Sequence, residues 1–330
     1  MKTLQSKQLA ELAGALAAQG YRVVAPQVDG EVVRLMEWAN GAAIEIARLP
    51  VNSAKDTLFP RSEIIGRYTF AGDEFTQENT LPQVRKTALL CVRPCDAAAI
   101  AVLDAVFNWD SVDVFYLAWR EACTVIALAC TACDENCFCT SVGGASDATK
   151  GADAILRPAD GGSRLILEPL TDKGEQIAQA GRKILVDDPA QADPPAEVPI
   201  RFDAAKVTDW LGKNFDSPRW AQWSLACLGC GACAFACLTC HCFDIQDEAT
   251  RAAGVRYRNW DACGLALFTL HTSGHNPRPN QAARWRQRVM HKFSYMPEKF
   301  QLVGCTGCGR CARVCGQGMA ILEVCKAISE

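Results

Sequence analysis

The amino-acid sequence predicts an α/β N-terminal domain followed by a mainly α-helical domain that is rich in cysteine. Three observations support this division of the chain. Strand-like and helix-like segments alternate through residues 1–186, which is typical of a small α/β domain with a largely parallel sheet. Residues 187–200 are rich in Pro, Asp and Ala, show no hydrophobic period and are expected to form a linker. A cysteine motif then occurs twice within residues 201–330.

The individual elements follow from the spacing of apolar residues along the chain. Leucines at helical spacing predict a helix over residues 4–18, which ends at Gly20. Apolar runs predict strands over residues 21–25, 31–36, 43–47, 87–91, 112–116 and 124–129. The segment DAAAIAVLDAVF predicts a helix over residues 96–107, with Asp96 near its start. An amphipathic pattern predicts a further helix over residues 203–215.

Length, charge and hydropathy exclude several classes of protein. The chain has 330 residues, enough for two domains that each bury a core. Its formal net charge of −3 gives no basic field that would attract nucleic acid or an anionic membrane. The N-terminus lacks the apolar core of a signal peptide, and no segment approaches the roughly 20 apolar residues that span a bilayer. We therefore expect a soluble, cytoplasmic protein that binds neither nucleic acid nor a membrane.

Nineteen cysteines indicate metal binding rather than disulfide bonds. An odd count, in a large chain without an export signal, is unlike the disulfide framework of a small secreted protein. Dense Cys-x2-Cys spacing in a reducing compartment is typical of a metal site. Some of these cysteines can still be buried structural thiols, which behave as small apolar side chains.

Two motifs of identical spacing, Cys-x2-Cys-x2-Cys-x3-Cys, predict two [4Fe–4S] clusters. In two-cluster ferredoxins, the first three cysteines of such a motif bind one cluster and the fourth binds the other. The first cluster is thus predicted on Cys227, Cys230, Cys233 and Cys315. The second is predicted on Cys305, Cys308, Cys311 and Cys237. Zinc usually takes two separated Cys-x2-Cys pairs, so it fits this pattern poorly.

The C-terminal domain is therefore expected to be a mainly α-helical, two-cluster [4Fe–4S] ferredoxin-like domain, expanded by a long insert. The proline that usually follows the fourth cysteine is absent, and Leu238 and Gly316 stand in its place. The insert carries Cys240, Cys242 and Cys263, which either form an additional metal site with His241 or are packed thiols.

The same insert ends in a basic stretch. Its spacing places Arg284, Arg288 and Lys292 on one helical face. This face is either solvated, or it forms a positive surface near anionic clusters or a docking site for a partner.

A second group of cysteines lies in the N-terminal domain. Cys95 precedes the helix predicted over residues 96–107, and Cys130, Cys137 and Cys139 follow a predicted strand. Ligands gather at the carboxyl ends of strands in open α/β sheets, and the positive end of a helix favours an anionic group. These four cysteines favour a third cluster. Because their spacing is not a standard one, a structural zinc or unligated buried thiols are open alternatives.

Several stretches in order along the chain carry a family resemblance: VRPCDAAAI at 92–100, CFCTS at 137–141, the segment 227–248 ending in CHCFDIQDE, WDAC at 260–263, HNPRP at 275–279, RWRQRVMHKF at 284–293 and GCGRC at 307–311. With these stretches the chain resembles the β-subunit family of cytoplasmic multi-subunit [NiFe]-hydrogenases (sulfhydrogenases), shared with the A subunit of anaerobic sulfite reductase.

The resemblance implies a third cluster on Cys95, Cys130, Cys137 and Cys139. By the same resemblance, Cys91 and Cys133 stand where the family has a glycine and a non-cysteine residue, so they are not expected to be ligands. It also implies a subunit without catalytic residues of its own, which relays electrons between a flavin subunit that handles NAD(P)H and a catalytic subunit.

Three functions are compatible with these patterns. The first is an electron-transfer subunit of a hydrogenase or, alternatively, of a sulfite or sulfur reductase. The chain has no Walker A sequence and no clean Gly-x-Gly-x-x-Gly turn, so FAD and NAD(P) are expected on a partner. The second is a catalytic sulfur-reducing subunit that uses the thiols of Cys240, Cys242 and Cys263. The third is a structural zinc protein that docks other subunits.

Overall fold

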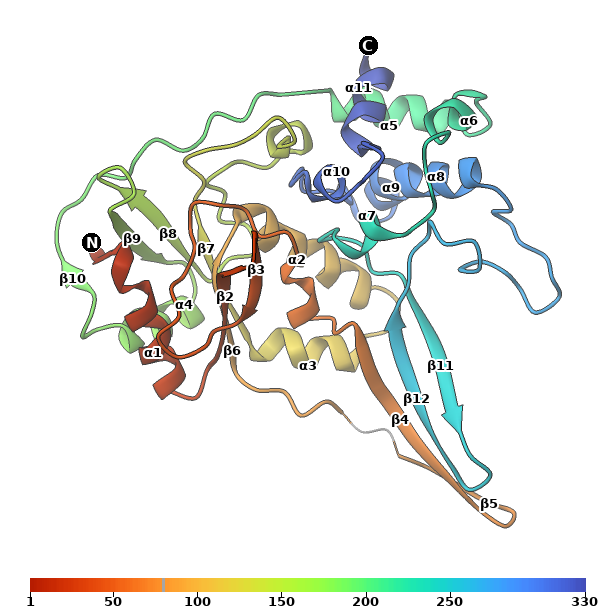
Figure 1. Cartoon of the computed structure of the whole chain (residues 1–330), viewed down its shortest axis with the longest axis horizontal. Coiled ribbons are helices and arrows are strands. Elements are labelled where there is room, and N and C mark those ends of the chain that lie inside the picture. The colour runs from red at the N-terminus through yellow and green to blue at the C-terminus, as the bar shows by residue number, and fades with distance from the viewer. Residues whose placement is uncertain (79–80) are drawn as a thin grey trace.

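A mixed sheet of eight strands forms the N-terminal half of the computed structural model, which describes residues 1–78 and 81–330. The strand order is β10-β1-β9-β8-β7-β6-β2-β3 (Figure 1). The four central strands run parallel: β2 (Arg22–Asp29), β6 (Thr87–Val92), β7 (Cys123–Leu128) and β8 (Ala154–Ala159). The flanking strands pair antiparallel: β1 (Lys2–Gln5), β3 (Val32–Glu37), β9 (Arg164–Pro169) and β10 (Val186–Asp187).

The expectation of a largely parallel sheet therefore holds only for its centre. Short connections join β2 to β3 and β8 to β9, and a short connection can join only antiparallel neighbours. The central strands β6 and β7 are buried along their whole length, as parallel strands covered on both faces must be.

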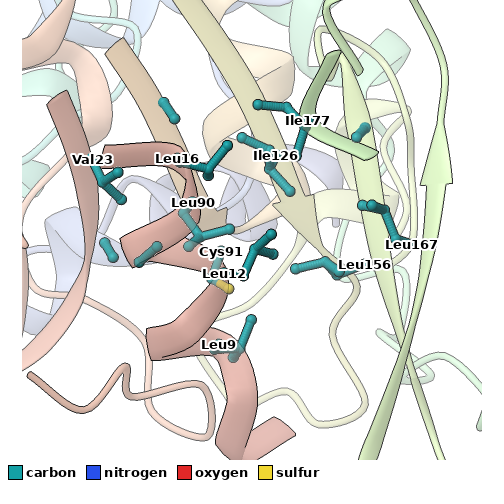
Figure 2. Close-up of a cluster of buried hydrophobic side chains, with 14 of the residues drawn as sticks. Leu9, Leu12, Leu16, Val23, Leu90, Cys91, Ile126, Leu156, Leu167 and Ile177 are labelled. Carbon is teal, nitrogen blue, oxygen red and sulfur yellow. The ribbon is translucent and has the colours of Figure 1, made fainter. Parts of the chain in front are cut away.

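Helices cover both faces of this sheet. On one face lie α1 (Leu9–Ala18) and α4 (Asp172–Ala180), and on the other lie α2 (Pro94–Phe107) and α3 (Val114–Ala122). Figure 2 shows the core between the sheet and the face covered by α1 and α4, where leucines of α1 pack against strand residues such as Leu90 and Ile126. The sheet and its helices thus position one of the cysteine groups, which lies at the N-terminus of α2.

Three of the predicted elements are wrong or misplaced. Residues 112–116, predicted as a strand, lead into α3, because the Asp113 side chain accepts a hydrogen bond from the Tyr116 amide and caps the helix. Residues 43–47 form no strand, since the Glu45 carboxylate accepts the amide of Ala47 and turns the chain. The helix predicted over 4–18 begins only at Leu9, because residues 2–5 pair as β1. The other predicted strands and helices are confirmed within a few residues.

A second sheet joins distant parts of the chain into an arm. Its order is β11-β12-β4-β5, and it projects away from the rest of the molecule (Figure 1). The strands are β4 (Ser62–Ala71), β5 (Glu74–Glu78), β11 (Phe243–Ala249) and β12 (Ala253–Trp260). Strand β12 pairs with β4, so the insert of the C-terminal half completes a sheet that the N-terminal half begins. The β11–β12 hairpin was not expected from the sequence.

Short helices joined by loops form the rest of the C-terminal half, so its expected mainly α-helical character is not confirmed; they pack around a core that includes Val207, Trp285 and Phe293. In order they are α5 (Ala204–Lys213), α6 (Arg219–Trp223), α7 (Ala232–Phe235), α8 (Gln281–Met290), α9 (Met296–Phe300), α10 (Arg310–Arg313) and α11 (Ile321–Ser329). A π-helical turn, His291–Tyr295, connects α8 to α9. In the part of the chain that the structure describes, no helix has both the length and the apolar character to cross a bilayer.

The segment expected to be a linker lies against the N-terminal sheet. Val186–Asp187 pairs with β1, the Asp193 amide donates to the Pro158 carbonyl at 2.7 Å, and the Ala196 amide donates to the Cys130 carbonyl at 2.8 Å. The division of the chain into 1–186, 187–200 and 201–330 stays a prediction of the sequence.

Candidate iron–sulfur centres

Four cysteines from both C-terminal motifs line one cavity: Cys227, Cys230, Cys233 and Cys315. Cys233 lies within the first turn of α7, and Cys227 and Cys230 lie on the tight loop that leads into α7. Gly229 and Gly231 take φ of 67° and 75° there, a left-handed conformation that favours glycine. The structure therefore brings the last cysteine of the second motif to the first three of the first motif, which is the crossed arrangement that the spacing predicts.

Hydrogen-bond donors surround this first cavity. The Gln281 side-chain amide donates to Cys227 Sγ at 3.1 Å, and the Met319 amide donates to Cys315 Sγ at 3.3 Å. Trp285 Nε1 and Arg288 Nε are buried without a hydrogen-bond partner, and both residues line the cavity. Buried donors without partners are destabilising, so their position fits an anionic group held by the four thiols.

The second group consists of Cys237 and three cysteines of the second motif: Cys305, Cys308 and Cys311. Burial and, to a smaller extent, the neighbouring thiols of Cys237 and Cys311 raise the pKa of Cys305 to about 12 and that of Cys308 to about 11. The four thiols thus lie within electrostatic reach of one another. The Lys292 ammonium donates to Cys237 Sγ at 3.2 Å.

The third group lies at the N-terminus of α2 in a cavity of about 210 Å³. Its walls include the four cysteines named by the sequence, Cys95, Cys130, Cys137 and Cys139. Cys308 of the second group lines the same cavity. Together with the positive end of α2, this donor set fits an anionic cluster.

Glycines allow the third group to approach the second closely. A Cβ atom on Gly307 would lie 2.5 Å from the Cys139 amide nitrogen, and one on Gly309 would lie 2.5 Å from the Asn136 carbonyl oxygen. Only glycine avoids these clashes, and both residues also have positive φ. The Phe138 amide donates to the Gly307 carbonyl at 2.9 Å. The loops of the two groups are therefore in direct contact.

Comparisons with known proteins support iron–sulfur clusters in this chain. Residues 226–319 match the family model described as a 4Fe-4S dicluster domain. Sulfhydrogenase 2 subunit beta of Pyrococcus furiosus is 30% identical over 268 residues, which cover 77% of this chain and 78% of that protein. This chain belongs to the sulfhydrogenase β-subunit family. No solved structure gives a significant match to it.

Two cysteines of this β-subunit-family chain differ from what the resemblance implies for their positions. Cys91 has φ of 59°, which explains why a glycine is expected there. Its side chain lies in the apolar core (Figure 2), and burial raises its pKa to about 12. Cys133 is exposed at the third cavity, where its thiol donates to the Glu197 carbonyl at 3.5 Å. Their exclusion as ligands stays a prediction.

The remaining thiols of the insert contact one another and the first two groups. A hydrogen bond from Cys242 lowers the pKa of Cys263 to about 6, and Cys263 lines the first cavity. Cys240 Sγ accepts a hydrogen bond from the Arg288 guanidinium at 3.5 Å. Within the described residues, no three Cys, His, Asp or Glu side chains are arranged around a single metal ion. Packed thiols therefore fit this trio better than an additional ion does.

The absence of a single-ion site among the described residues concerns mononuclear metals, and it is compatible with clusters. A single zinc ion requires all four ligands around one point. A cubane carries its thiolates on separate iron atoms, so the ligands stand further apart. The dicluster match supports clusters within residues 226–319, and a cluster on the third group stays a prediction.

Three buried cations contact residues 233–240, the segment that joins the first group to the second, and we call Lys55, Arg288 and Lys292 the cation group. Their exposed fractions are 5%, 4% and 5%. Lys292 Nζ also donates to Thr239 Oγ1 at 2.8 Å and to the Gly304 carbonyl at 2.7 Å.

The other two members of the cation group contact the loop between the motifs. Arg288 donates to the Cys233 carbonyl at 3.1 Å. Lys55 Nζ donates to the Cys240 carbonyl at 2.9 Å and lies 4.0 Å from the centre of the Trp260 ring.

Thiols set the charge state of two members of this group. Burial acts to lower the pKa of Arg288 and of Lys292, but nearby thiols, Cys233 and Cys237 first among them, outweigh burial and raise both values. For Lys55, burial dominates and lowers the pKa. Of the basic face predicted on the insert, Arg288 and Lys292 are thus buried against thiols and not solvated. Nothing in the sequence pointed to Lys55, which lies far away in the N-terminal half.

A buried ion pair fixes the second motif to the N-terminal half. Arg310 lies between two cysteines of the motif, and its guanidinium donates to Asp96 at 2.9 Å, with 1% of either side chain exposed. The Asp96 carboxylate also accepts the Arg93 amide at the start of α2. The sequence identified Asp96 only as a helix-start residue, because its partner is more than two hundred positions away.

Proposed function

We propose that the chain is an iron–sulfur electron-transfer subunit of a multi-subunit [NiFe]-hydrogenase. In this proposal it relays electrons between a partner that binds FAD and NAD(P) and a partner that carries the catalytic site. The observation that carries the proposal is the continuity of the three cysteine groups. Cys308 borders the third group, while Cys233 of the first group lies on α7 and Cys237 of the second follows just after that short helix. Electrons would therefore pass from group to group along one path.

The ligand sets in this proposal are those of the three groups. Cys227, Cys230, Cys233 and Cys315 would hold the first cluster, Cys305, Cys308, Cys311 and Cys237 the second, and Cys95, Cys130, Cys137 and Cys139 the third. A [4Fe–4S] cluster supplies one-electron transfer when bound. The chain holds the thiolates in place, and Gln281 and Lys292 donate hydrogen bonds to them.

Partner subunits are supported by the relative and by the surface. The relative is named as one subunit of a sulfhydrogenase. Cys230 is exposed, and next to it along the chain Leu225 and Leu228 are 85% and 75% exposed. Exposed apolar side chains that gather at one place mark interaction sites, so we propose that a partner covers the first cluster. A cytoplasmic location is part of the proposal, since clusters on thiolates suit a reducing compartment.

Metal analysis of anaerobically prepared protein tests the clusters. We expect about 8–12 iron atoms and as much acid-labile sulfide per chain, with a paramagnetic signal on reduction. Cys315→Ser and Cys237→Ser should each remove or alter one cluster signal. Cys325→Ala is the matched control, because Cys325 is buried in the same half but belongs to none of the three groups. Colourless protein that contains zinc and no iron would overturn the proposal.

Purification of the native complex tests the partners. We expect a flavoprotein and a nickel-containing subunit, together with hydrogen-dependent reduction of NAD(P). A sirohaem-containing partner with sulfite reduction would move the chain to the alternative, an electron-transfer subunit of a sulfite or sulfur reductase. The relay itself would be retained in that case.

One observation favours a second candidate, a sulfur-reducing catalytic subunit. The thiol of Cys263, with its pKa lowered to about 6 by Cys242, borders the first cavity. A thiolate of this kind can attack a polysulfide. Turnover of polysulfide by the isolated chain with a reduced viologen, lost in Cys263→Ser, would support this function. An inactive isolated chain would exclude it.

A further inference from the structure

The cation group lacks the counter-charges that other buried cations of this chain have. Within the described residues, none of its members forms an ion pair with a carboxylate, and the charges that act on them most strongly are those of thiols and of each other. Elsewhere, Arg258 is 4% exposed and pairs with Glu63 at 2.6 Å. Arg310 is paired with Asp96 in the same way.

An unpaired buried cation is strongly destabilising, so an anion must offset this charge in the native protein. The sulfur atoms in contact with the cation group are the Sγ atoms of Cys237 and Cys240, at 3.2 and 3.5 Å. Thiolates on a [4Fe–4S] core, together with the core itself, would supply the missing negative charge. Lys292 therefore faces the second cluster as its counter-charge, while Arg288 also borders the cavity of the first.

Cations also lie at the other two cysteine groups. In the third group, Arg313 contacts Cys137 Sγ at 3.5 Å and is neutralised by Asp134 through an ion pair of 2.6 Å. Arg93 donates there to backbone carbonyls and to the Cys130 thiol. In the first group, Arg284 and Arg288 line the cavity, while the side-chain donor to Cys227 Sγ is the neutral amide of Gln281.

We infer that the cation group, Lys292 above all, raises the reduction potential of the proposed cluster on Cys237. A nearby positive charge and a charged hydrogen bond to a ligand sulfur both favour the extra electron of the reduced state. Lys292 acts most strongly because it donates to the ligand sulfur itself. Arg288 and Lys55 have a smaller effect, because they contact Cys240 and neighbouring carbonyls and not a ligand sulfur.

Redox titration followed by electron paramagnetic resonance tests this assignment in the full chain. In Lys292→Met, we expect the midpoint potential of one cluster to shift to lower values, while the others keep theirs. Lys292→Arg, which keeps the charge, should shift it less. Lys213→Met is the surface control, because Lys213 is 69% exposed and pairs with Asp209 far from the thiols. The signal that is lost in Cys237→Ser identifies the second cluster.

Each outcome decides between the inference and the proposed function. Unchanged potentials in Lys292→Met with full iron content would overturn the inference and leave the relay intact. A shift in a signal that survives in Cys237→Ser would overturn it as well. If Lys292→Met loses its clusters, Lys55→Met is the substitute variant, because Lys55 contacts only carbonyls and a ring. We then expect a smaller shift of the midpoint potential in the same direction. An unchanged potential in Lys55→Met would refute the inference. Wild-type protein without any iron would instead refute the proposed function.

Discussion

Arg310 and Lys292 lie in the same half of the molecule and are almost equally buried, but their surroundings differ in one respect. Arg310 is neutralised by a carboxylate from the N-terminal half, Asp96. Lys292 contacts a thiol, a hydroxyl and a carbonyl, and has no carboxylate partner among the residues that the structure describes. The first charge is balanced by the polypeptide alone, whereas the second is balanced only when Cys237 is ionised.

Folding alone provides the negative partner of Arg310, whereas the cofactor contributes to the negative charge next to Lys292. The Asp96–Arg310 pair can form in protein without clusters, so it holds the two halves together in either state. The negative charge next to Lys292 is largest in the loaded protein, where the iron–sulfur core adds to the charge of Cys237. Four predictions test or refine this contrast.

Removal of one partner of the buried pair should have the largest effect. Arg310→Leu leaves Asp96 buried and unpaired, so we expect the free energy of unfolding to fall by about 3–5 kcal/mol. Urea unfolding followed by circular dichroism measures this loss. The loss should be the same with and without clusters. A double change, Asp96→Asn with Arg310→Met, should recover part of it; a loss below about 1 kcal/mol would contradict the role of the pair.

The effect of Lys292→Met should instead depend on the clusters. In loaded protein it removes a charged hydrogen bond, which contributes about 1.5–3 kcal/mol. In protein stripped of iron by a chelator, the charge of the iron–sulfur core is gone and only Cys237, whose pKa is lowered by a hydrogen bond from Cys240 and by Lys292, offsets the ammonium, so the same change should cost less. Urea unfolding of both forms measures the difference. Equal losses in the two forms would mean that the clusters do not balance the charge.

Acid should destabilise the protein through His291, which packs against His241 with ring centres 5.2 Å apart. Burial lowers the pKa of His291 from 6.5 to about 3 in the folded protein, so the unfolded chain takes up a proton first as the pH falls. Stability is therefore full above pH 6.5 and is lost towards pH 3, by at most about 1.4 kcal/mol per pH unit for one proton.

Unfolding experiments between pH 7 and 5.5 test this dependence, with visible absorbance recorded to verify that clusters are retained. His291→Asn should make the loss less steep. His275→Asn serves as control, because His275 lies on an exposed loop. Parallel pH profiles for wild type and His291→Asn would exclude this contribution.

Cys91 should give the smallest change. Its left-handed φ of 59° is unfavourable for any residue with a Cβ atom, but its side chain fills space in the core. Because these two effects oppose each other, we expect Cys91→Gly to alter the free energy of unfolding by less than about 1 kcal/mol and to leave the iron content unchanged. Cys91→Val should be clearly destabilising, since branching at Cβ aggravates the strain. Loss of iron in Cys91→Gly would make Cys91 a ligand.

Much of the candidate site could be predicted from the sequence because its information is local. The spacing of the two cysteine motifs and the helix that follows Cys95 each depend on residues a few positions apart. The glycine that the resemblance implies at position 91 is consistent with the left-handed conformation of Cys91.

The rest depends on residues that meet only in the folded chain. Lys55 reaches Cys240, and Asp96 reaches Arg310, across nearly two hundred positions or more, and neither pairing leaves a periodic pattern. The strand predicted over 112–116 failed for a different reason. Its apolar residues suit a strand or a helix, and a single capping side chain, Asp113, decides for the helix.

The arm that projects from the molecule has a consequence for biosynthesis. Strand β4, made early, finds its neighbour β12 only after the ribosome has added almost two hundred further residues. Until then β4 and β5 present an unpaired sheet edge, which is the kind of surface that invites wrong pairing. The nascent chain therefore remains vulnerable through most of its translation, and a chaperone that shields the β4–β5 hairpin would act at this stage.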